Sequence, residues 1–213
     1  MQYLEFKNRF QSLPLIAGKD LLALEDPRNM KNQLARWVKK GLITQLRKGL
    51  YLLGKTDRRV YPGRLYLASQ LYNPSYISLE LALNHYGIIP EQVMDTPSIS
   101  TKKTTSFKNE FGLFTYQTIK PKAFRGFTAR EDASGLTYFI AEPEKAVVDF
   151  IYLNLPKFKI GDAAVFTESY RFQRLEQLNT GKLKQYAELF NNAKLTAVVK
   201  TLMALVRQEK AHD

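Results

Sequence analysis

Residues 26–53, DPRNMKNQLARWVKKGLITQLRKGLYLL, hold the most complete set of structural signals in the chain. Asp26 is a favourable N-cap, and Pro27 suits the first helical position because its missing N–H would be unpaired there. Apolar residues at helical spacing predict one buried face: Met30, Leu34, Trp37 and Val38. Gly41 can adopt the left-handed conformation that ends a helix. The sequence therefore predicts a helix from Pro27 to Lys40.

A β-hairpin is expected directly after this helix. The runs ITQL (43–46) and LYLL (50–53) are β-prone, and Arg47-Lys48-Gly49 joins them with a loop length and glycine placement typical of hairpins. Alternation of apolar and polar residues is imperfect in both runs. The register of the hairpin therefore stays open at this point.

Two more helices are expected before residue 26. Pro14 would close the first, whose apolar residues recur at steps of three and four: Tyr3, Phe6, Phe10 and Leu13. The segment from Lys19 to Leu24 is rich in apolar residues and predicts a second helix of about two turns. A helix, a short helix, a basic helix and a basic hairpin follow one another in winged helix-turn-helix domains. We therefore expect such a domain over residues 1–55 and a second domain over residues 56–213.

The positive charge of the chain is concentrated in its first third. The net charge is +12, and residues 1–72 hold 14 Lys and Arg against 5 Asp and Glu, a net of +9. A field of this kind favours a polyanionic partner, although basic surfaces also serve solubility alone.

The outward face of the predicted 27–40 helix combines cations with amides and carries almost no acid. Lys and Arg neutralise phosphates, while Asn can read base edges in the major groove. We expect DNA contacts from this face and from the hairpin tip: Arg28, Asn29, Lys31, Asn32, Arg36, Lys39, Arg47 and Lys48. Arg28, Asn29 and Asn32 are the predicted base readers. Arg47 and Lys48 are the predicted phosphate contacts. A winged helix that only docks proteins would tend to lack such a face.

Residues 56–213 predict a mixed domain that ends in helices, so the expected fold class is α+β. Strands are predicted over 97–101, 111–119 and 135–141, which are rich in β-branched and aromatic residues. The basic stretches 102–112 and 120–132 resemble loops or hairpin ends. Helices are predicted between Ser78 and Gly87, from Pro143 onward, and over an apolar stripe near the end of the chain. Lys145 and Asp149 form a polar pair that we expect to be buried and structural.

Several kinds of chemistry find no support in the sequence. Cys is absent and only two His occur, so thiolate and His-based metal sites are not expected. Glycine-rich phosphate loops and the common hydrolase motifs are missing, so no cofactor, catalytic residue or enzymatic activity is expected. No run of 18 apolar residues and no signal peptide is found, which favours the cytoplasm. A metal-dependent nuclease stays as an alternative, because carboxylates and a lysine lie close together: Glu142, Glu144, Lys145 and Asp149.

Three segments resemble the AbiEi-type antitoxins, a family of bacterial abortive-infection proteins in type IV toxin–antitoxin systems. They are LARWVKKGLITQLRKGLYLL (34–53), YISLELALNHYGII (76–89) and AEPEKAVVDFIYL (141–153). The resemblance covers about residues 15–155 in the same order, and its last two segments are the more specific part.

The resemblance implies an N-terminal winged helix that binds and represses the promoter of its own operon. It also implies a C-terminal domain that opposes a nucleotidyltransferase-like toxin encoded beside it. The expected partners are therefore double-stranded DNA and that toxin, with a homodimer on the DNA left open. The alternative is a stand-alone winged-helix regulator whose C-terminal domain senses a ligand or dimerises.

Overall fold

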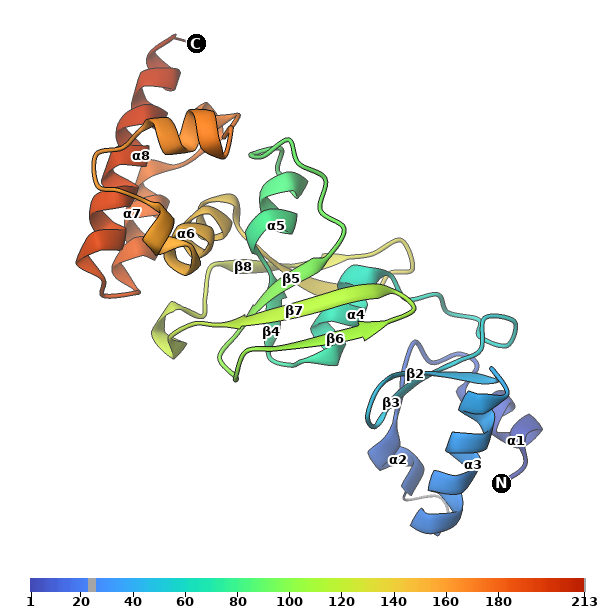
Figure 1. Ribbon diagram of the computed structural model, residues 1–213. Helices are drawn as coiled ribbons and strands as arrows, with labels where there is room; N and C mark the ends of the chain where they lie inside the picture. The colour runs from blue at the N-terminus through green and yellow to red at the C-terminus, as the bar shows by residue number, and fades with distance from the viewer. Residues whose placement is uncertain (23–25, 213) are drawn as a thin grey trace.

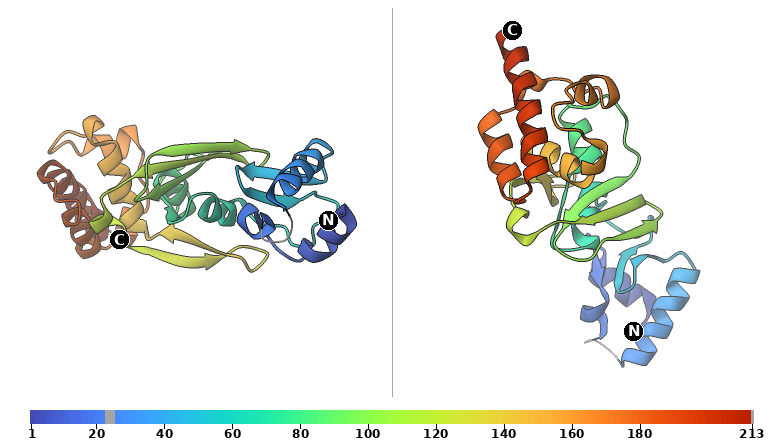
Figure 2. Two further views of the ribbon diagram at one scale, coloured as in Figure 1. Left: turned by 90° about the horizontal axis from the view of Figure 1, so that it is seen from below. Right: turned by 60° about the vertical axis from the view of Figure 1, so that its left-hand side comes forward.

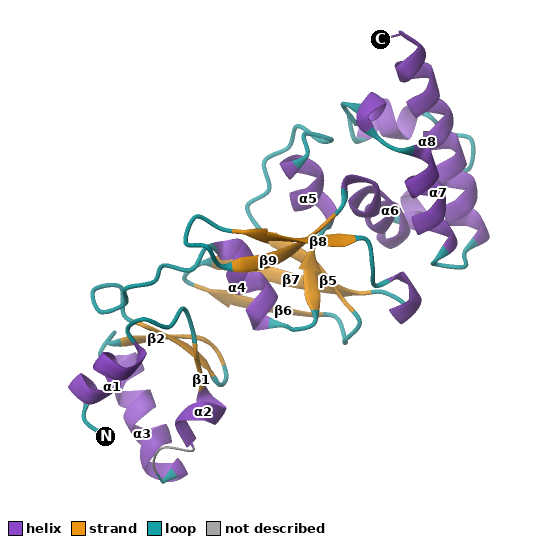
Figure 3. Ribbon diagram, turned by 180° about the vertical axis from the view of Figure 1, so that it is seen from behind, coloured by secondary structure: helices purple, strands orange, loops and turns teal. Residues whose placement is uncertain are grey.

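The computed structural model describes residues 1–22 and 26–212 and shows a mixed α and β protein with helices at both ends (Figure 1). Figure 2 and Figure 3 show the N-terminal region, residues 1–55, and the last helices on opposite sides of a central sheet. Within the described residues, no helix is long and apolar enough to cross a membrane.

The described N-terminal region contains α1 (Tyr3–Phe10), β1 (Ile16–Ala17), α2 (Gly18–Leu22), α3 (Pro27–Lys39), β2 (Ile43–Arg47) and β3 (Leu50–Leu53). β3 lies between β1 and β2 in an antiparallel sheet. The predicted basic helix and the predicted hairpin are confirmed as α3 and β2–β3, whereas the sequence did not predict β1. The first helix ends at Phe10, so Leu13 lies outside it and is exposed. The predicted end of the second helix, at residues 23 and 24, lies outside the described residues.

An aromatic core joins α1 to α3. The ring of Phe6 lies 4.7 Å from that of Trp37 and 4.8 Å from that of Phe10, centroid to centroid. The buried side chains of this core are Phe6, Phe10, Ile16, Leu21, Met30, Leu34, Trp37, Ile43 and Leu53. Each large apolar side chain contributes roughly 1.5–3 kcal/mol when it is fully buried. This packing fixes which face of α3 points inward and leaves the opposite face to solvent.

The hairpin buries apolar side chains on both of its faces. Ile43 and Leu53 belong to the core of the N-terminal region, whereas Leu46, Leu50 and Leu52 belong to the core of the C-terminal region. A strand that is covered on both sides reads as a continuous apolar run, because neither face needs polar residues. This explains why alternation in LYLL is imperfect.

Further contacts hold the N-terminal region and the connector after it, residues 56–63, against the central sheet. The side-chain amide of Asn109 donates to the carbonyl of Leu46 at 3.3 Å. The guanidinium of Arg58 lies 5.7 Å from the ring centroids of both Tyr61 and Phe111. The two regions are therefore packed together, and residues 56–63 do not act as a free tether.

The central sheet has the strand order β6-β7-β5-β4-β9-β8. Its strands are β4 (Ser75–Ile77), β5 (Thr96–Ser100), β6 (Thr105–Asn109), β7 (Gly112–Thr118), β8 (Phe127–Glu131) and β9 (Thr137–Ala141). The three predicted strands are confirmed as β5, β7 and β9. By contrast, β6 and β8 occupy the stretches predicted as loops or hairpin ends. Both lie at the edges of the sheet, where polar strands are tolerated because one side is open to solvent.

The helices of the C-terminal region are α4 (Arg64–Leu71), α5 (Leu79–His85), α6 (Pro143–Leu153), α7 (Thr180–Glu188) and α8 (Ala193–His212). Short turns complete it: η1 (Pro121–Ala123), η2 (Leu155–Lys157), η3 (Val165–Ser169) and η4 (Leu175–Gln177). The predicted helices near Ser78 and Pro143 are confirmed as α5 and α6. α7 and α8 pack against α6. The predicted apolar stripe of α8 faces the core. Leu205 is half-buried. The other residues of the stripe are fully buried: Leu195, Val198, Val199, Leu202 and Val206.

The helices α4 and α6 cover opposite faces of the sheet. Tyr116 in β7 donates its hydroxyl to the carbonyl of Ala68 in α4 at 2.7 Å. Tyr76 in β4 points to the other face, where its hydroxyl donates to the Asp149 carboxylate of α6 at 2.9 Å. Buried tyrosines thus connect each helix layer to the sheet through a hydrogen bond as well as through packing.

Candidate functional site

The start and end of α3 are fixed by local contacts. The carboxylate of Asp26 accepts from the backbone N–H of Arg28 at 3.1 Å and of Asn29 at 3.0 Å, and Pro27 follows it as the first helical residue. Gly41 has a φ of +70°, which ends the helix as predicted. Because one face is held in the core by Trp37 and its neighbours, the orientation of α3 is determined.

The opposite face of α3 displays all six of the candidate residues that the sequence placed on this helix. Each of them is exposed to solvent: Arg28, Asn29, Lys31, Asn32, Arg36 and Lys39. Within residues 1–22 and 26–212, none of the cations among them forms an ion pair. A surface that served solubility alone would typically intersperse charges of both signs. Among the described residues, this face instead presents cations and amides without ion-paired carboxylates.

The two candidate residues of the hairpin differ in their surroundings. Lys48 is exposed and precedes Gly49, whose φ of +76° closes the turn. Arg47 is the last residue of β2, pairs with Leu50 after a register shift, and is half-buried. Its guanidinium donates to the carbonyl of Lys48 at 3.1 Å. The loop is therefore shorter than expected, and only Lys48 is fully displayed at its tip.

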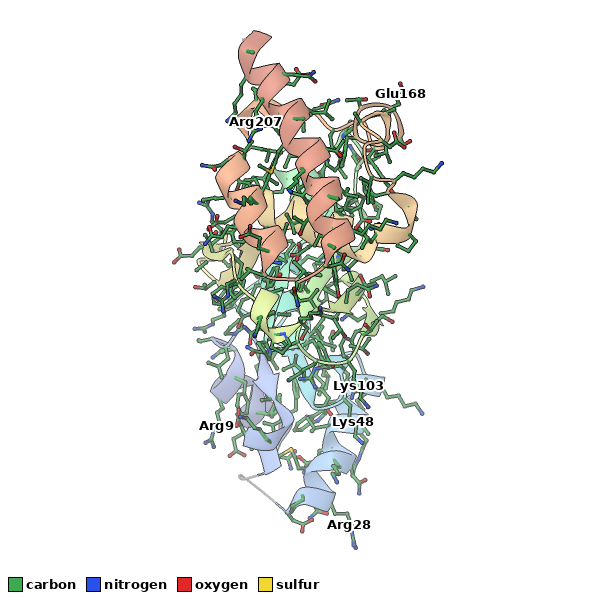
Figure 4. All side chains as sticks on the ribbon, turned by 90° about the vertical axis from the view of Figure 1, so that its left-hand side faces the viewer. Arg9, Arg28, Lys48, Lys103, Glu168 and Arg207 are labelled. Carbon is green, nitrogen blue, oxygen red and sulfur yellow. The ribbon has the colours of Figure 1, made fainter. Side chains whose placement is uncertain are left out.

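Arg47 lies at the joint between the N-terminal region and the sheet. Burial raises the pKa of Tyr116 in β7, and the positive charge of Arg47 opposes that rise. This coupling puts the guanidinium close to the sheet, which the sequence could not indicate. Figure 4 shows Arg28 and Lys48 on the same side of the molecule, together with Lys103 from the loop between β5 and β6.

A second group of charged residues is buried in the C-terminal region. Lys145 and Asp149 form an ion pair within α6, and both side chains are fully buried. The Asp149 carboxylate also accepts from the hydroxyls of Tyr76 and Ser78, each at 2.9 Å. The Lys145 ammonium lies 4.9 Å from the ring centroid of Phe190. The sequence predicted the buried pair but not its hydroxyl partners.

The electrostatics of this group are those of a structural network. Burial raises the pKa of Asp149 and lowers the pKa of Lys145, and the ion pair between them opposes both shifts. The hydroxyl donors Tyr76 and Ser78 further oppose the rise in the pKa of Asp149. Every polar atom of the Asp149 carboxylate that faces the core has a hydrogen-bond donor. These bonds link β4, the start of α5 and α6.

The carboxylates that suggested a metal-dependent nuclease bond to different partners in the structure. Glu142 accepts from the Lys182 ammonium at 2.6 Å and from the Tyr186 hydroxyl at 2.9 Å. Glu144 accepts from the backbone N–H of Asn179 at 2.9 Å. Asp149 is enclosed in the buried network. Among the described residues, no group of three or more His, Asp or Glu is placed to hold a metal ion.

No protein-family model matches the chain, and a search of curated proteins returns no match.

Proposed function

We propose that residues 1–55 form a winged helix-turn-helix that binds double-stranded DNA, and that the chain represses transcription of its own operon. The order of elements supports this proposal, because α1, β1, α2, α3 and the β2–β3 hairpin follow one another as in winged helices. In that arrangement, α3 is the helix that enters the major groove.

The observation that carries the proposal is the exposed face of α3. It combines four cations with two amides and, in the described part of the chain, no ion-paired carboxylate. The helix has 13 residues and is about 20 Å long at 1.5 Å per residue, which suits insertion into a major groove. Arg28, Asn29 and Asn32, near its N-terminus, are the proposed base readers. Lys31, Arg36 and Lys39 are the proposed phosphate contacts.

The hairpin tip contributes a further proposed phosphate contact. Lys48 is exposed and lies on the same side of the molecule as Arg28 (Figure 4). In winged helices, the hairpin reaches the backbone or minor groove beside the recognition helix. Arg47 is half-buried, so we assign it mainly to the joint with the sheet.

We further propose that the chain is the antitoxin of a type IV toxin–antitoxin pair. This rests on the resemblance of residues 76–89 and 141–153 to the AbiEi-type antitoxins. The two segments meet in one buried network, in which Tyr76 and Ser78 donate to Asp149. A direct contact between the more specific segments is what a shared architectural unit would require. The toxin would be of the nucleotidyltransferase-like class.

Fluorescence anisotropy of the purified protein with the duplex from upstream of its own gene tests DNA binding. A shuffled duplex of equal length and composition serves as the control, and both are measured over a salt series. We expect a preference for the native duplex that persists at physiological salt. Equal and steeply salt-dependent binding to both duplexes would reduce the basic face to non-specific attraction. Absence of binding would make the N-terminal region a protein-docking module.

A stand-alone regulator is the second candidate, and one observation favours it. The C-terminal region contains a cavity of about 820 Å³, which is large enough for a small-molecule effector. The antitoxin and the stand-alone regulator differ in their genetic setting, because only the former requires a toxin gene beside it. Co-expression with that neighbouring gene product, scored by growth rescue, separates the two.

A further inference from the structure

A cavity of about 820 Å³ opens on the sheet face that α5 and α6 cover. Its walls come from six parts of the chain: the start of α5, the segment from Ile89 to Asp95, strand β5, strand β7, the end of α6, and residues 169–170. Figure 1 shows the segment between α5 and β5 in green, arching beside α5 before it enters the sheet. This site is far along the chain from the exposed face of α3, and the DNA-binding proposal does not use it.

The inner wall of the cavity is apolar and partly aromatic. Leu79 and Ile89 are buried there, and Phe150 from α6 meets Tyr170 edge to face at 4.9 Å between ring centroids. Tyr170 is half-buried, so part of its ring borders the open space. An apolar wall with an accessible aromatic ring suits the body of an organic ligand.

The charge of the lining is opposite to that of the whole chain. The protein has a net charge of +12, yet the lining holds three carboxylates and neither Lys nor Arg: Glu80, Glu91 and Asp95. Arg171 neutralises Glu91 from outside the lining. Within residues 1–22 and 26–212, Glu80 and Asp95 form no ion pair. Glu80 and Tyr170 both line the cavity, and burial and then the negative charge of Glu80 raise the pKa of Tyr170.

The rim of the cavity is held in place by the chain itself. The side chain of Arg64, at the start of α4, donates to the carbonyl of Met94. The backbone N–H of Gln173 donates to the carbonyl of Ile88 at 2.8 Å, which fixes the opposite end of the same segment. Met94 itself lies at the rim and is 79% exposed. A preformed cavity of this kind needs little reorganisation when it binds a ligand.

We infer that this cavity binds a small organic ammonium compound with an apolar or aromatic body. The body would fill the space beside Phe150 and Tyr170. The ammonium group would bind the unpaired carboxylates of Glu80 and Asp95 by charge-assisted hydrogen bonds, with the face of Tyr170 as a further attraction. The volume lies within the range of small-molecule sites in proteins. The inference is independent of DNA binding by α3.

Saturation-transfer NMR with three matched probes tests the charge preference. The probes are 2-phenylethylamine, the neutral 2-phenylethanol and the anionic 3-phenylpropionate, each at millimolar concentration with the full chain. We expect saturation transfer to the amine and little to the alcohol or the acid, because only the amine can pair with the carboxylates. Equal transfer to all three probes, or transfer to none, would overturn the inference.

A pair of variants locates the site. Glu80→Gln with Asp95→Asn removes the two unpaired charges and keeps the size of both side chains, and should weaken amine binding by about tenfold or more. Glu131→Gln with Glu209→Gln makes the same change in net charge at exposed positions outside the lining. This control should bind the amine as the unmodified chain does. Equal loss in both variants would mean that the amine responds to overall charge and would contradict the assigned site. Circular dichroism of each variant checks that it is folded.

Discussion

The helices α3 and α6 begin with the same sequence signal and use their charges in opposite ways. Each has a proline at the first helical position after an acidic residue, Asp26 in one case and Glu142 in the other. α3 buries three residues and presents its charges, all of one sign, to solvent. α6 buries eight residues, and each buried charge has a partner: Lys145 pairs with Asp149, and Glu144 accepts from the backbone N–H of Asn179. Pairing and burial of the charges, rather than their presence, therefore separate the structural network of α6 from the proposed binding face of α3.

The energies of the two arrangements differ accordingly. A charge in the core must be compensated, because its desolvation costs several kcal/mol and only good geometry recovers that cost. Adding or removing an exposed charge changes the free energy of unfolding very little. We therefore expect substitutions in α6 to change the free energy of unfolding. Substitutions in α3 should change DNA binding instead.

The largest expected effect is in α6. Lys145→Met removes one member of the buried pair and leaves the Asp149 carboxylate without its counter-ion. The free energy of unfolding should fall by about 3–5 kcal/mol, measured by urea denaturation with far-UV circular dichroism.

The double variant Lys145→Met with Asp149→Leu is the matched control. Replacement of both charges by apolar side chains leaves no unpaired buried charge, but the hydroxyls of Tyr76 and Ser78 lose their acceptor. The double variant should therefore be more stable than the single variant and less stable than the unmodified chain. A double variant as unstable as the single one would show that the role of this pair is not mutual neutralisation. The charges of α6 would then not differ from those of α3 in being neutralised by each other.

The next effect in size concerns base reading by α3. Asn32→Ala should reduce discrimination between the native duplex and a duplex altered at the contacted base by about 1–3 kcal/mol. Unfolding should change little, because Asn32 is exposed. Competition anisotropy with a set of single-base variants of the native duplex measures the discrimination. An unaltered preference at every position would remove Asn32 from the base-reading set.

The smallest effect separates the two cations of the hairpin. Lys48→Ala should lower the slope of log K against log salt by about 0.9, because we propose that this exposed cation contacts one phosphate. Arg47→Ala should change the slope less and lower stability instead, since its guanidinium is half-buried near Tyr116. Salt-series anisotropy and urea denaturation on both variants check this. A larger slope change for Arg47 than for Lys48 would reverse the assignment of the hairpin tip.

Elements with local signals could be predicted from the sequence. Asp26 with Pro27 begins α3, Gly41 ends it and Gly49 closes the hairpin turn, and each signal acts within a few residues of itself. The edge strands β6 and β8 lack such signals, because their polar residues adopt strand structure only through pairing with β7 and β9. Their existence depends on tertiary neighbours, which local propensity cannot represent.

The features of the candidate site also fall into two groups, those set by local sequence and those set by distant residues. The exposed face of α3 could be predicted, since the apolar spacing of Met30, Leu34 and Trp37 fixes what remains outside. The partners of Asp149 could not, because Tyr76 and Ser78 lie 73 and 71 positions away. The half-burial of Arg47 also escaped prediction, because it depends on how the hairpin packs against the central sheet.

The most direct test of the central claim measures the salt dependence of DNA binding for two variants of equal charge. One replaces Arg28, Lys31, Arg36 and Lys39 of α3 by Ala. The other replaces four exposed lysines of the C-terminal region by Ala: Lys157, Lys159, Lys194 and Lys200. If α3 contacts DNA, the slope of log K against log salt should fall by about three units in the first variant, because Lys31, Arg36 and Lys39 are the proposed phosphate contacts. The second variant should keep the slope of the unmodified chain. Equal slopes in the two variants would contradict the assignment of α3 as the DNA-binding face.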